Sequence, residues 1–364
     1  MTRRYFIAAD PVDWDYAPAG ANRITGEKFD KDHDQSAAAT DPGVAASSAE
    51  QAEAGGPATY TEPGPKRIGR VYRKSLYREY TDSSFATAKV RGAEWDHLGF
   101  LGPPIHAEVG DTIEVAFRNN TPYPASMHPH GVLYDKASEG ATYDDGRTDA
   151  NAGIVAPGAT YTYRWKVPER AGPGPMDGSS VMWMYHSHVD EPVDVDAGLM
   201  GSIIITKRGM ARADGTPKDV DRELVASYFI DNENNSPWLD ANIAAHVPGT
   251  DKTDAEFTEA NLKHTINGYL FGNGPGFTVR QGEHVRWYVM AMGNEADTHT
   301  PHWHGNTVTV MGMRTDTVSV FPATMVTADM NPDNPGRWLF HCHVSDHLKA
   351  GMITTYNVQA AAGG

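Results

Sequence analysis

The chain has 364 residues, which is enough for two domains of roughly 150–200 residues each. Its 31 Lys and Arg residues face 47 Asp and Glu residues, and the net charge of −16 makes a nucleic-acid partner unfavourable. No apolar run reaches the roughly 18 residues of a transmembrane helix, and a single cysteine, Cys342, excludes an intrachain disulfide framework. The 36 glycines and 24 prolines favour many short strands joined by turns.

The first residues, Met1–Asp10, are basic and then apolar. The apolar part is too short for the core of a signal peptide, so we expect Tyr5–Asp10 to form a first β-strand. The sequence does not decide the cellular compartment, because the chain is either cytoplasmic or exported by a leader outside these residues. Residues 35–58 contain Ala, Ser, Gly and Glu without a large apolar side chain, and we expect a long loop over about residues 31–66.

From Val71 onward, short apolar or alternating segments are separated by clusters of Gly, Pro, Asn and Asp. They are VYRKSLYREY, TIEVAFRN, TYTYRWKV and GSIIITK, followed by ELVASYFI, HTINGYL, HVRWYVMAM, TVTVMGM and ITTYNV. This pattern predicts an all-β protein built from antiparallel sandwich or barrel domains.

The two halves of the chain resemble each other. HLGFLGPPIHAEVGDTIEVAF before MHPHGV in the first half corresponds to YLFGNGPGFTVRQGEHVRWYV before PHWHGN in the second. We therefore predict a duplicated unit, with domain 1 over residues 1–207 and domain 2 over residues 208–364. A polar segment near Lys207–Asp221 is the expected linker.

Histidines form the most specific pattern in the sequence. Four His-x-His pairs occur, two in each half at matching positions of the repeat: His128/His130, His186/His188, His302/His304 and His341/His343. Random placement of 16 histidines in 364 residues would give fewer than one such pair. In a strand, residues i and i+2 point to the same face, so each pair can present two imidazoles to one site. Eight imidazoles exceed the ligand set of one metal ion and predict a cluster of several metals.

Cys342 stands between two of these histidines, and on a strand its sulfur must point to the opposite face. It can therefore bind a second, separate metal. His299 lies three residues before His302, and His347 and Met352 follow Cys342. Two His, one thiolate and a weak Met are the ligands of a blue-copper electron-transfer site. A lone buried cysteine is usually an inert hydrophobic residue, but that explanation leaves the two flanking histidines unexplained.

The motifs HPHG, HSH, HTPHWHG and HCHVSDHLKAGM resemble the four copper motifs of multicopper oxidases. Longer segments such as YFIAADPVDWDYAP and HPHGVLYDKASEGATY are similar to the ceruloplasmin branch. The prediction of two domains, rather than three or six, suggests the two-domain laccase-like group. The resemblance covers most of the chain except the loop near residues 35–58. It implies cupredoxin-like Greek-key domains and a laccase-like enzyme that oxidises phenols or aromatic amines and reduces O₂ to water.

The resemblance also implies a role for each residue that matches a motif. The type 1 copper would be held by His299, Cys342, His347 and Met352. The type 2 copper would be held by His128 and His302. The type 3 pair would be held by His130, His186, His188, His304, His341 and His343. Every position needed for four copper ions per chain is filled.

In the first half, the positions of the type 1 ligands carry other residues. In the order of the ligands just named, they are Ala125, Ser187, Pro192, and either Leu199 or Met200. The resemblance therefore implies that only domain 2 holds a type 1 copper. This argues against a copper nitrite reductase, a relative that keeps its type 1 site in domain 1.

Reduction of O₂ consumes protons, so a carboxylate is expected near the cluster. Glu139, Asp144 and Asp145 follow His130 in one loop, and we favour Glu139, with a solvated loop acid as the alternative. Tyr134 is a candidate neighbour of the type 2 copper, where a phenol would give an extra electron. Core packing is the alternative explanation for this tyrosine.

The electron donor is less defined by the sequence. Asp297 and Asp346 border type 1 ligands, where their carboxylates would steer Fe²⁺, as in a ferroxidase, or orient a phenol proton. Seven of the 14 methionines lie between Met290 and Met352, and thioethers suit Cu⁺, although alternating methionines on strands are more often core residues. A non-enzymatic cupredoxin needs only the type 1 ligands, so the eight cluster histidines favour an enzyme.

The cluster ligands come from both domains, so a face of domain 1 must meet a face of domain 2. In two-domain relatives this contact joins neighbouring chains, and the resemblance implies a homotrimer with copper clusters at its interfaces. Pairing within one chain stays open. The resemblance also implies a secreted or periplasmic location, with O₂ and a small reducing substrate as partners.

Overall fold

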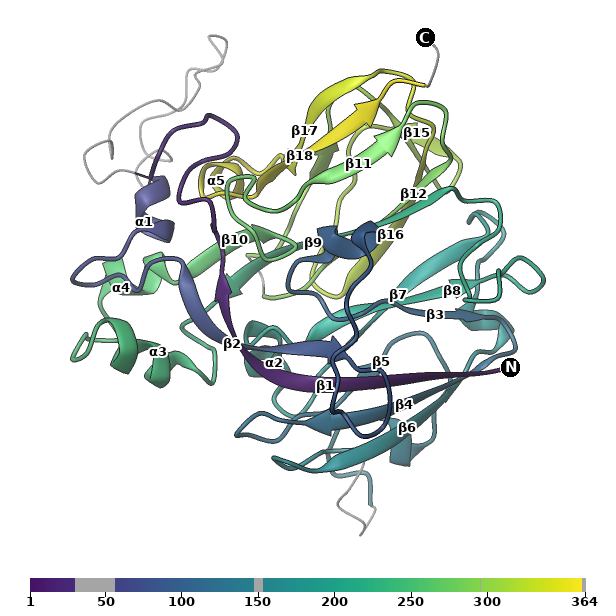
Figure 1. Ribbon diagram of the computed structural model, residues 1–364, viewed down its shortest axis with the longest axis horizontal. Helices are drawn as coiled ribbons and strands as arrows, with labels where there is room; N and C mark the ends of the chain where they lie inside the picture. The colour runs from purple at the N-terminus through teal and green to yellow at the C-terminus, as the bar shows by residue number, and fades with distance from the viewer. Residues whose placement is uncertain (30–55, 147–152, 295, 362–364) are drawn as a thin grey trace.

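Four β-sheets are stacked in layers (Figure 1). The computed structural model describes residues 1–29, 56–146, 153–294 and 296–361. The first sheet has the order β2 (Val71–Glu79), β1 (Thr2–Asp15), β4 (Thr112–Asn119) and β6 (Thr160–Lys166). The second sheet has the order β3 (Ile105–Glu108), β8 (Met200–Thr206), β7 (Ser180–His186) and β5 (His128–Pro129).

The other two sheets come from the second half of the chain. The third has the order β10 (Leu262–Ile266), β9 (Arg222–Asn232), β12 (Val285–Ala291), β16 (Thr324–Met330), β14 (Val308–Val310) and β15 (Met313–Thr315). The fourth has the order β11 (Phe277–Arg280), β18 (Ile353–Gln359), β17 (Gly336–Cys342) and β13 (Pro301–Trp303). Short helices connect the strands: α1 (Pro57–Thr61), η2 (Ala93–Leu98), η3 (Lys136–Ser138), η4 (Glu169–Ala171), α2 (Glu191–Asp196), α3 (Leu239–His246), α4 (Ala255–Ala260) and α5 (Ser345–Lys349).

Strand order confirms the predicted duplication. β2, β1 and β4 of the first sheet correspond to β10, β9 and β12 of the third, and in each set the last two strands are parallel. The second sheet corresponds in the same way to the fourth, with the parallel pairs β3–β8 and β11–β18. The all-β prediction is confirmed, but the sheets are mixed rather than purely antiparallel. Parallel neighbours arise because the chain crosses between the two sheets of a sandwich before it returns.

The central strands β8 and β12 of the two middle layers are buried on both faces, which explains their continuous apolar runs. Along β12, Trp287 and Val289 belong to the core between the third and fourth sheets, whereas Tyr288 and Met290 belong to the core between the second and third. β8 is buried along its whole length, and its Ile204 contributes to the same middle core. The two sandwiches therefore share an apolar interface, and the chain forms one stack.

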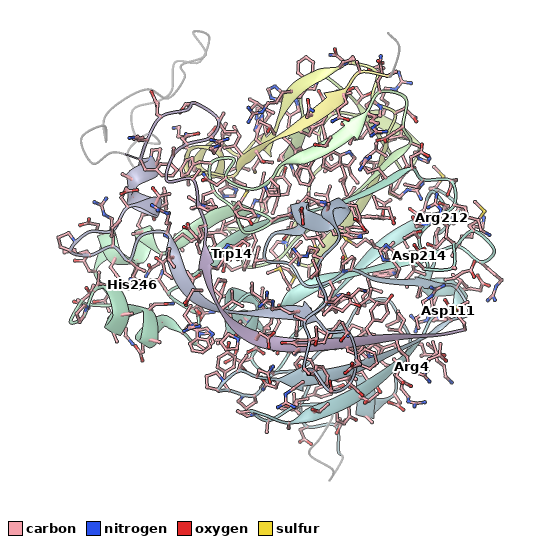
Figure 2. All side chains as sticks on the ribbon, viewed as in Figure 1. Arg4, Trp14, Asp111, Arg212, Asp214 and His246 are labelled. Atoms are coloured by element: carbon pink, nitrogen blue, oxygen red, sulfur yellow. The ribbon has the colours of Figure 1, made fainter. Side chains whose placement is uncertain are left out.

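The start of the chain reaches across this stack. Trp14, near the end of β1, lies where the two halves meet (Figure 2). Its indole Nε1 donates to the Gly268 carbonyl oxygen at 2.7 Å, and its ring lies against Phe100 and Tyr269. Strand β1 thus ties the second half of the chain to the first sheet. The division at residue 207 stays a prediction; β8 ends at Thr206 and β9 begins at Arg222.

The predicted loop over about residues 31–66 lies largely outside the described residues. Its end differs from the prediction, because Pro57–Thr61 forms helix α1. Proline suits the first turn of a helix, and the buried side chains of Ala58 and Tyr60 join a core cluster with residues of both halves. Among the described residues, no helix has the length and apolar character needed to cross a bilayer.

Candidate metal centres

The two histidine pairs of the first half gather at one end of the second sheet. His128 in β5 lies directly opposite His186 in β7. The ligand nitrogens of His128, His130 and His186 lie within 4.8 Å of one another, and the Nε2 atoms of His130 and His186 are 3.0 Å apart. The His188 ring is centred 5.0 Å from that of His128. We call these four residues the first-half histidine group.

Hydrogen bonds prepare this group for metal binding. The Nδ1 atom of His128 donates to the Glu139 carbonyl oxygen at 2.7 Å, and that of His186 donates to the Ser187 carbonyl oxygen at 2.9 Å. A carbonyl can only accept, so each ring carries its proton on Nδ1 and offers the Nε2 lone pair. Burial lowers the pKa of His130 to about 4 and that of His186 to about 3, which keeps both rings neutral at pH 7.

The second half repeats this arrangement in the fourth sheet. His302 in β13 lies opposite His341 in β17, the same pairing as in the first half. The Nε2 atoms of His304 and His341 are 3.0 Å apart, and His302 Nδ1 lies 3.3 Å from His341 Nε2. The His343 ring is centred 5.3 Å from that of His302. These four residues are the second-half histidine group, and burial lowers the pKa of His341 to about 4.

A separate site lies behind the second-half histidine group. Cys342 Sγ is 3.6 Å from His347 Nδ1 and 3.9 Å from His299 Nδ1, and the two Nδ1 atoms are 3.1 Å apart. All three side chains are buried, and we call them the thiolate site. Met352 is also fully buried, and its backbone is hydrogen-bonded to Cys342 and His347. Strand alternation therefore separates the thiol from its histidine neighbours, as its place in the sequence predicts.

Asp297 holds the thiolate site from within the protein. Its Oδ1 atom accepts from His299 Nε2 at 3.1 Å and from the Ile230 backbone at 2.7 Å. This bond leaves the His299 Nδ1 lone pair free to bind a metal. Gly293 makes the arrangement possible, because its φ is +113° and an added Cβ would lie 2.1 Å from an Asp297 carboxylate oxygen. Asp297 is fully buried, so it is placed to orient His299 and not to meet a donor at the surface.

Of the other predicted site residues, Tyr134 lies beside His128, and Glu139 contacts His128 through its backbone carbonyl. The Glu139 carboxylate binds Lys136 Nζ at 2.8 Å and Tyr143 OH at 3.0 Å; burial raises its pKa, but these bonds outweigh burial and lower it. Its link to His128 runs through the backbone carbonyl. The Tyr134 ring is centred 5.8 Å from that of His128. Asp346 is exposed beside His347.

Backbone hydrogen bonds show which first-half residues occupy the type 1 positions. Ser187 N donates to Leu199 O at 3.1 Å, as Cys342 N donates to Met352 O at 3.0 Å. Leu199 N donates to Asp194 O at 3.2 Å.

Met352 N makes the corresponding bond to His347 O at 2.9 Å. Asp194, and not Pro192, therefore stands at the His347 position, and Leu199 stands at the Met352 position. The cause is a longer connection, because Asp194 follows His188 by six positions whereas His347 follows His343 by four.

Sequence reasoning also passed over His264, which lies outside the His-x-His motifs. Its ring is centred 5.4 Å from that of His347, and burial lowers its pKa to about 3. The residue reaches the thiolate site from β10, in the third sheet. No motif marks it, because it approaches the site only through the packing of one sheet on another.

The two histidine groups do not meet within the described part of the chain. In those residues, the rings of each group contact rings of the same half and none of the other half. Two members of the first-half group, His128 and His130, line an open cavity of about 360 Å³ together with Tyr134 and Arg170. Each group therefore supplies four of the eight motif histidines, and the two groups lie apart among the described residues.

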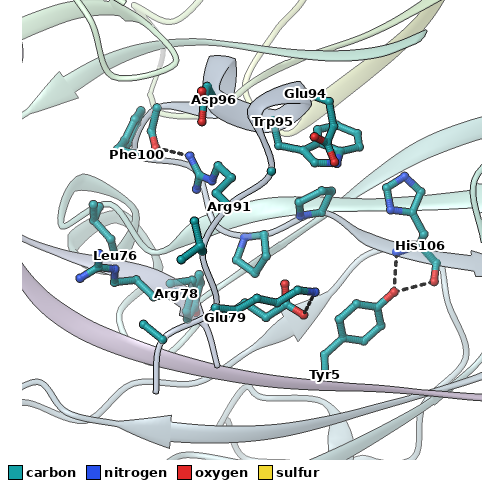
Figure 3. Close-up of a pocket in the computed structure, with 18 of the residues that line it drawn as sticks. Tyr5, Leu76, Arg78, Glu79, Arg91, Glu94, Trp95, Asp96, Phe100 and His106 are labelled. Atoms are coloured by element: carbon teal, nitrogen blue, oxygen red, sulfur yellow. Dashed lines mark hydrogen bonds and ion pairs between the residues drawn. The ribbon is translucent and has the colours of Figure 1, made fainter. Parts of the chain in front are cut away.

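A larger cavity lies in another part of the described structure. It measures about 730 Å³ and is lined by aromatic and charged side chains, among them Tyr5, Trp95, Phe100 and Arg91 (Figure 3). None of its lining residues belongs to the histidine groups or to the thiolate site.

The donor sets fit copper. Atoms 3.0–3.9 Å apart can share one ion at bond lengths of about 2 Å. Imidazole nitrogens suit copper, and two His with one Cys and a neighbouring Met match a blue-copper site. The hydrogen bonds at the second ring nitrogens of His128, His186, His299 and His341 are those that metal-bound histidines require.

Comparison with known proteins agrees with this chemistry. Models of the multicopper oxidase family match residues 98–209 and residues 246–362. The chain belongs to the multicopper oxidase family. It falls in the ceruloplasmin branch, because it is 42% identical over 364 residues to human ferroxidase HEPHL1 and 40% identical over 365 residues to human ceruloplasmin.

These alignments cover 98% of this chain but only 29% and 32% of the two relatives. The chain therefore spans less than a third of the length of these two relatives. A crystal structure of a multicopper oxidase shares the fold, with a TM-score of 0.58, 18% sequence identity, and coverage of 98% of this chain and 89% of that chain. The expected cupredoxin-like fold is confirmed, and the family implies copper as the metal.

Proposed function

We propose that this multicopper oxidase is a ferroxidase that couples oxidation of four Fe²⁺ ions to reduction of one O₂, with uptake of four protons and release of two waters. The observation that carries the proposal is the buried thiolate site placed directly behind a histidine group. Bound copper would supply one-electron chemistry at the thiolate site and O₂ reduction at the histidine groups. The full complement is four copper ions per chain, held by the residues assigned from the motifs.

The chain itself connects the two kinds of site. Cys342 contributes its thiol to one site, and its peptide neighbours His341 and His343 contribute imidazoles to the other. A hydrogen bond from His341 Nδ1 to the Cys342 carbonyl oxygen, at 2.8 Å, gives a second connection. The connection through His341 is short and buried, because Cys342 is fully buried and His341 is 5% exposed, whereas His343 is exposed.

The surface near His347 favours a cationic donor. His347 is 7% exposed, and the exposed Asp346 carboxylate adjoins it in the sequence. A carboxylate oxygen is a suitable ligand for a divalent cation such as Fe²⁺ and attracts it electrostatically. The relatives named as a ferroxidase and as ceruloplasmin support this choice over the laccase-like oxidation of phenols.

Cuprous ions are a second candidate donor, supported by one observation. Most methionines of the second half are core residues, such as Met290 and Met330. Met311 and Met313 are exceptions, with exposed fractions of 58% and 69%, and the Met176 methyl lies 3.3 Å from the position of a Cβ on the intervening Gly312. Thioethers gathered at a surface suit Cu⁺.

A homotrimer would complete the copper cluster. Each chain offers one first-half and one second-half histidine group that do not meet each other among the described residues. Head-to-tail contacts between chains can close into a ring in which every first-half group meets a second-half group. The relatives are long enough to hold three units of this length in one chain, which agrees with a ring of three. A location outside the cytoplasm stays a prediction of the family resemblance.

Absorption spectra and oxygen uptake test the reaction. The copper-loaded protein should be blue, show a near-ultraviolet type 3 band, and consume O₂ faster with Fe²⁺ than with phenols. Asp346→Asn should raise the KM for Fe²⁺ and leave phenol oxidation unchanged. Asp240→Asn, which removes an 81% exposed carboxylate far from the ligands in sequence, is the matched control. A blue protein without the near-ultraviolet band and without oxygen uptake would indicate an electron carrier instead.

Complementation tests the assembly. One variant carries His186→Ala and His188→Ala, and the other carries His302→Ala and His304→Ala, so every cluster built from one variant alone lacks two of its eight histidines. If clusters form between chains, random mixing restores about a quarter of the interfaces and returns oxygen uptake. If co-expressed chains assemble but stay inactive, the cluster does not form between chains in the proposed way.

A further inference from the structure

The first half keeps the framework of a type 1 copper site but fills it with hydrogen bonds. Ser126 N donates to Ser187 Oγ at 3.0 Å, where Thr300 N donates to Cys342 Sγ at 3.4 Å in the second half. The Ser187 hydroxyl therefore occupies the place of the thiol. At the His347 position stands Asp194, and Ser187 Oγ donates to its Oδ2 atom at 2.6 Å.

Asp194 holds more than the serine. The same Oδ2 atom accepts the backbone N–H groups of Val189 at 3.1 Å and Asp190 at 3.2 Å. Val189 and Asp190 directly follow His188, and Ser187 lies between His186 and His188. The carboxylate therefore fixes the strand end that carries two cluster ligands, and it does so from a position only 3% exposed.

In the second half, Cys342 and His347 stand at the positions of Ser187 and Asp194. Cys342 Sγ and His347 Nδ1 are 3.6 Å apart, which is too far for a strong hydrogen bond and suits a shared metal ion. Copper at the thiolate site would connect the strand end to α5. In the first half no such ion can bind, because Ala125, Ser187 and Leu199 supply neither imidazole nor sulfur ligands.

We propose that Asp194 is a positioning residue for the copper cluster, which fixes His186 and His188 as the type 1 copper fixes His341 and His343 in the second half. This inference rests on the proposed copper-binding function. It assigns to Asp194 an effect on copper held by the first half, and no effect on the thiolate site. Charge-assisted hydrogen bonds are the strong class, and loss of such an outer partner typically weakens metal binding by about 10–100-fold.

The test compares copper binding by Asp194→Ala, Asp194→Asn and the unmodified chain. Each apoprotein is titrated with copper while the blue band and the near-ultraviolet band are recorded separately. Asp194→Ala should keep the blue band and bind the cluster copper about 10–100-fold more weakly. Asp194→Asn keeps an oxygen acceptor for the same three donors and should restore most of the affinity.

Asp196→Asn is the matched control. Asp196 is also buried in α2, but its carboxylate accepts from Asn232 and Asn235 and makes no bond to the Ser187–Asp190 segment. Full cluster affinity in Asp194→Ala would overturn the proposal. So would equal loss of both bands, because that result indicates general unfolding. If the unmodified chain forms a blue band but no cluster band, the proposed function fails, and with it the basis of this inference.

Discussion

Asp297 and Asp346 are alike in the sequence but have opposite surroundings in the structure, and their substitution should separate two roles. Asp297 is fully buried and accepts three hydrogen bonds, from His299 Nε2, Ile230 N and Asn294 N. Asp346 is exposed. Asp297→Ala should therefore damage the thiolate site and the fold, whereas Asp346→Asn should affect only the donor.

The magnitude follows from the lost partners. Asp297→Ala leaves two buried donors, His299 Nε2 and Ile230 N, without an acceptor, at a cost of about 1–3 kcal/mol each in the free energy of unfolding. Asp297→Asn keeps Oδ1 and loses only the bond from the exposed Asn294 N, a cost of about 1 kcal/mol. Asp346→Asn, at the surface, should stay within about 0.5 kcal/mol of the unmodified chain.

Urea unfolding of the apoproteins and copper titration of the blue band measure both effects. Asp297→Ala should also bind type 1 copper about 10–100-fold more weakly, because His299 loses the partner that sets its tautomer. If Asp297→Ala unfolds at the same urea concentration as the unmodified chain and binds copper equally well, the positioning role is wrong. The same holds if Asp346→Asn is destabilised as much as Asp297→Ala.

Three further predictions follow from the same geometry. Cys342→Ser should remove the blue band and abolish Fe²⁺ oxidation while circular dichroism stays unchanged; retained activity would refute the electron route. The four changes that convert the first half to a type 1 ligand set should create a second blue site, seen as a doubled absorbance per chain: Ala125→His, Ser187→Cys, Asp194→His and Leu199→Met. Burial lowers the pKa of His97 to about 3, and its Nε2 accepts from Val225 N at 3.0 Å. The unfolded state therefore binds more protons than the folded state between about pH 6.5 and pH 3. As the pH is lowered through this window, the free energy of unfolding decreases by up to about 1.4 kcal/mol per pH unit. His97→Gln keeps an acceptor without titrating, so its urea midpoint should depend less on pH; an unchanged slope would contradict this.

Much of the framework could be predicted because it depends on local periodicity. The segments TIEVAFRN and TYTYRWKV form β4 and β6 almost as expected, and TVTVMGM forms the hairpin of β14 and β15. β16 was missed, because Thr324–Met330 mixes Thr, Asp and Met and has a weak apolar pattern. The parallel pairs could not be predicted either, since they depend on how the chain crosses between sheets.

The His-x-His pattern predicts the histidine groups because strand alternation places i and i+2 on one face. The sequence comparison misplaced the first-half equivalent of His347 by two residues. Counting forward from His188 with the second-half spacing reaches Pro192, whereas counting back from Leu199 reaches Asp194. Connection length between elements varies, so only the backbone hydrogen bonds decide. The burial of Asp297 was likewise hidden, because a polar loop residue carries no sign of whether the loop turns inward.

Native mass spectrometry of the copper-loaded protein tests the central claim most directly, since it counts chains and metal ions in one particle. The account predicts three chains that carry four copper ions each, because both histidine groups and the thiolate site are then filled. A monomer that binds a single copper ion, even in excess copper, would show that the histidine groups do not complete one another.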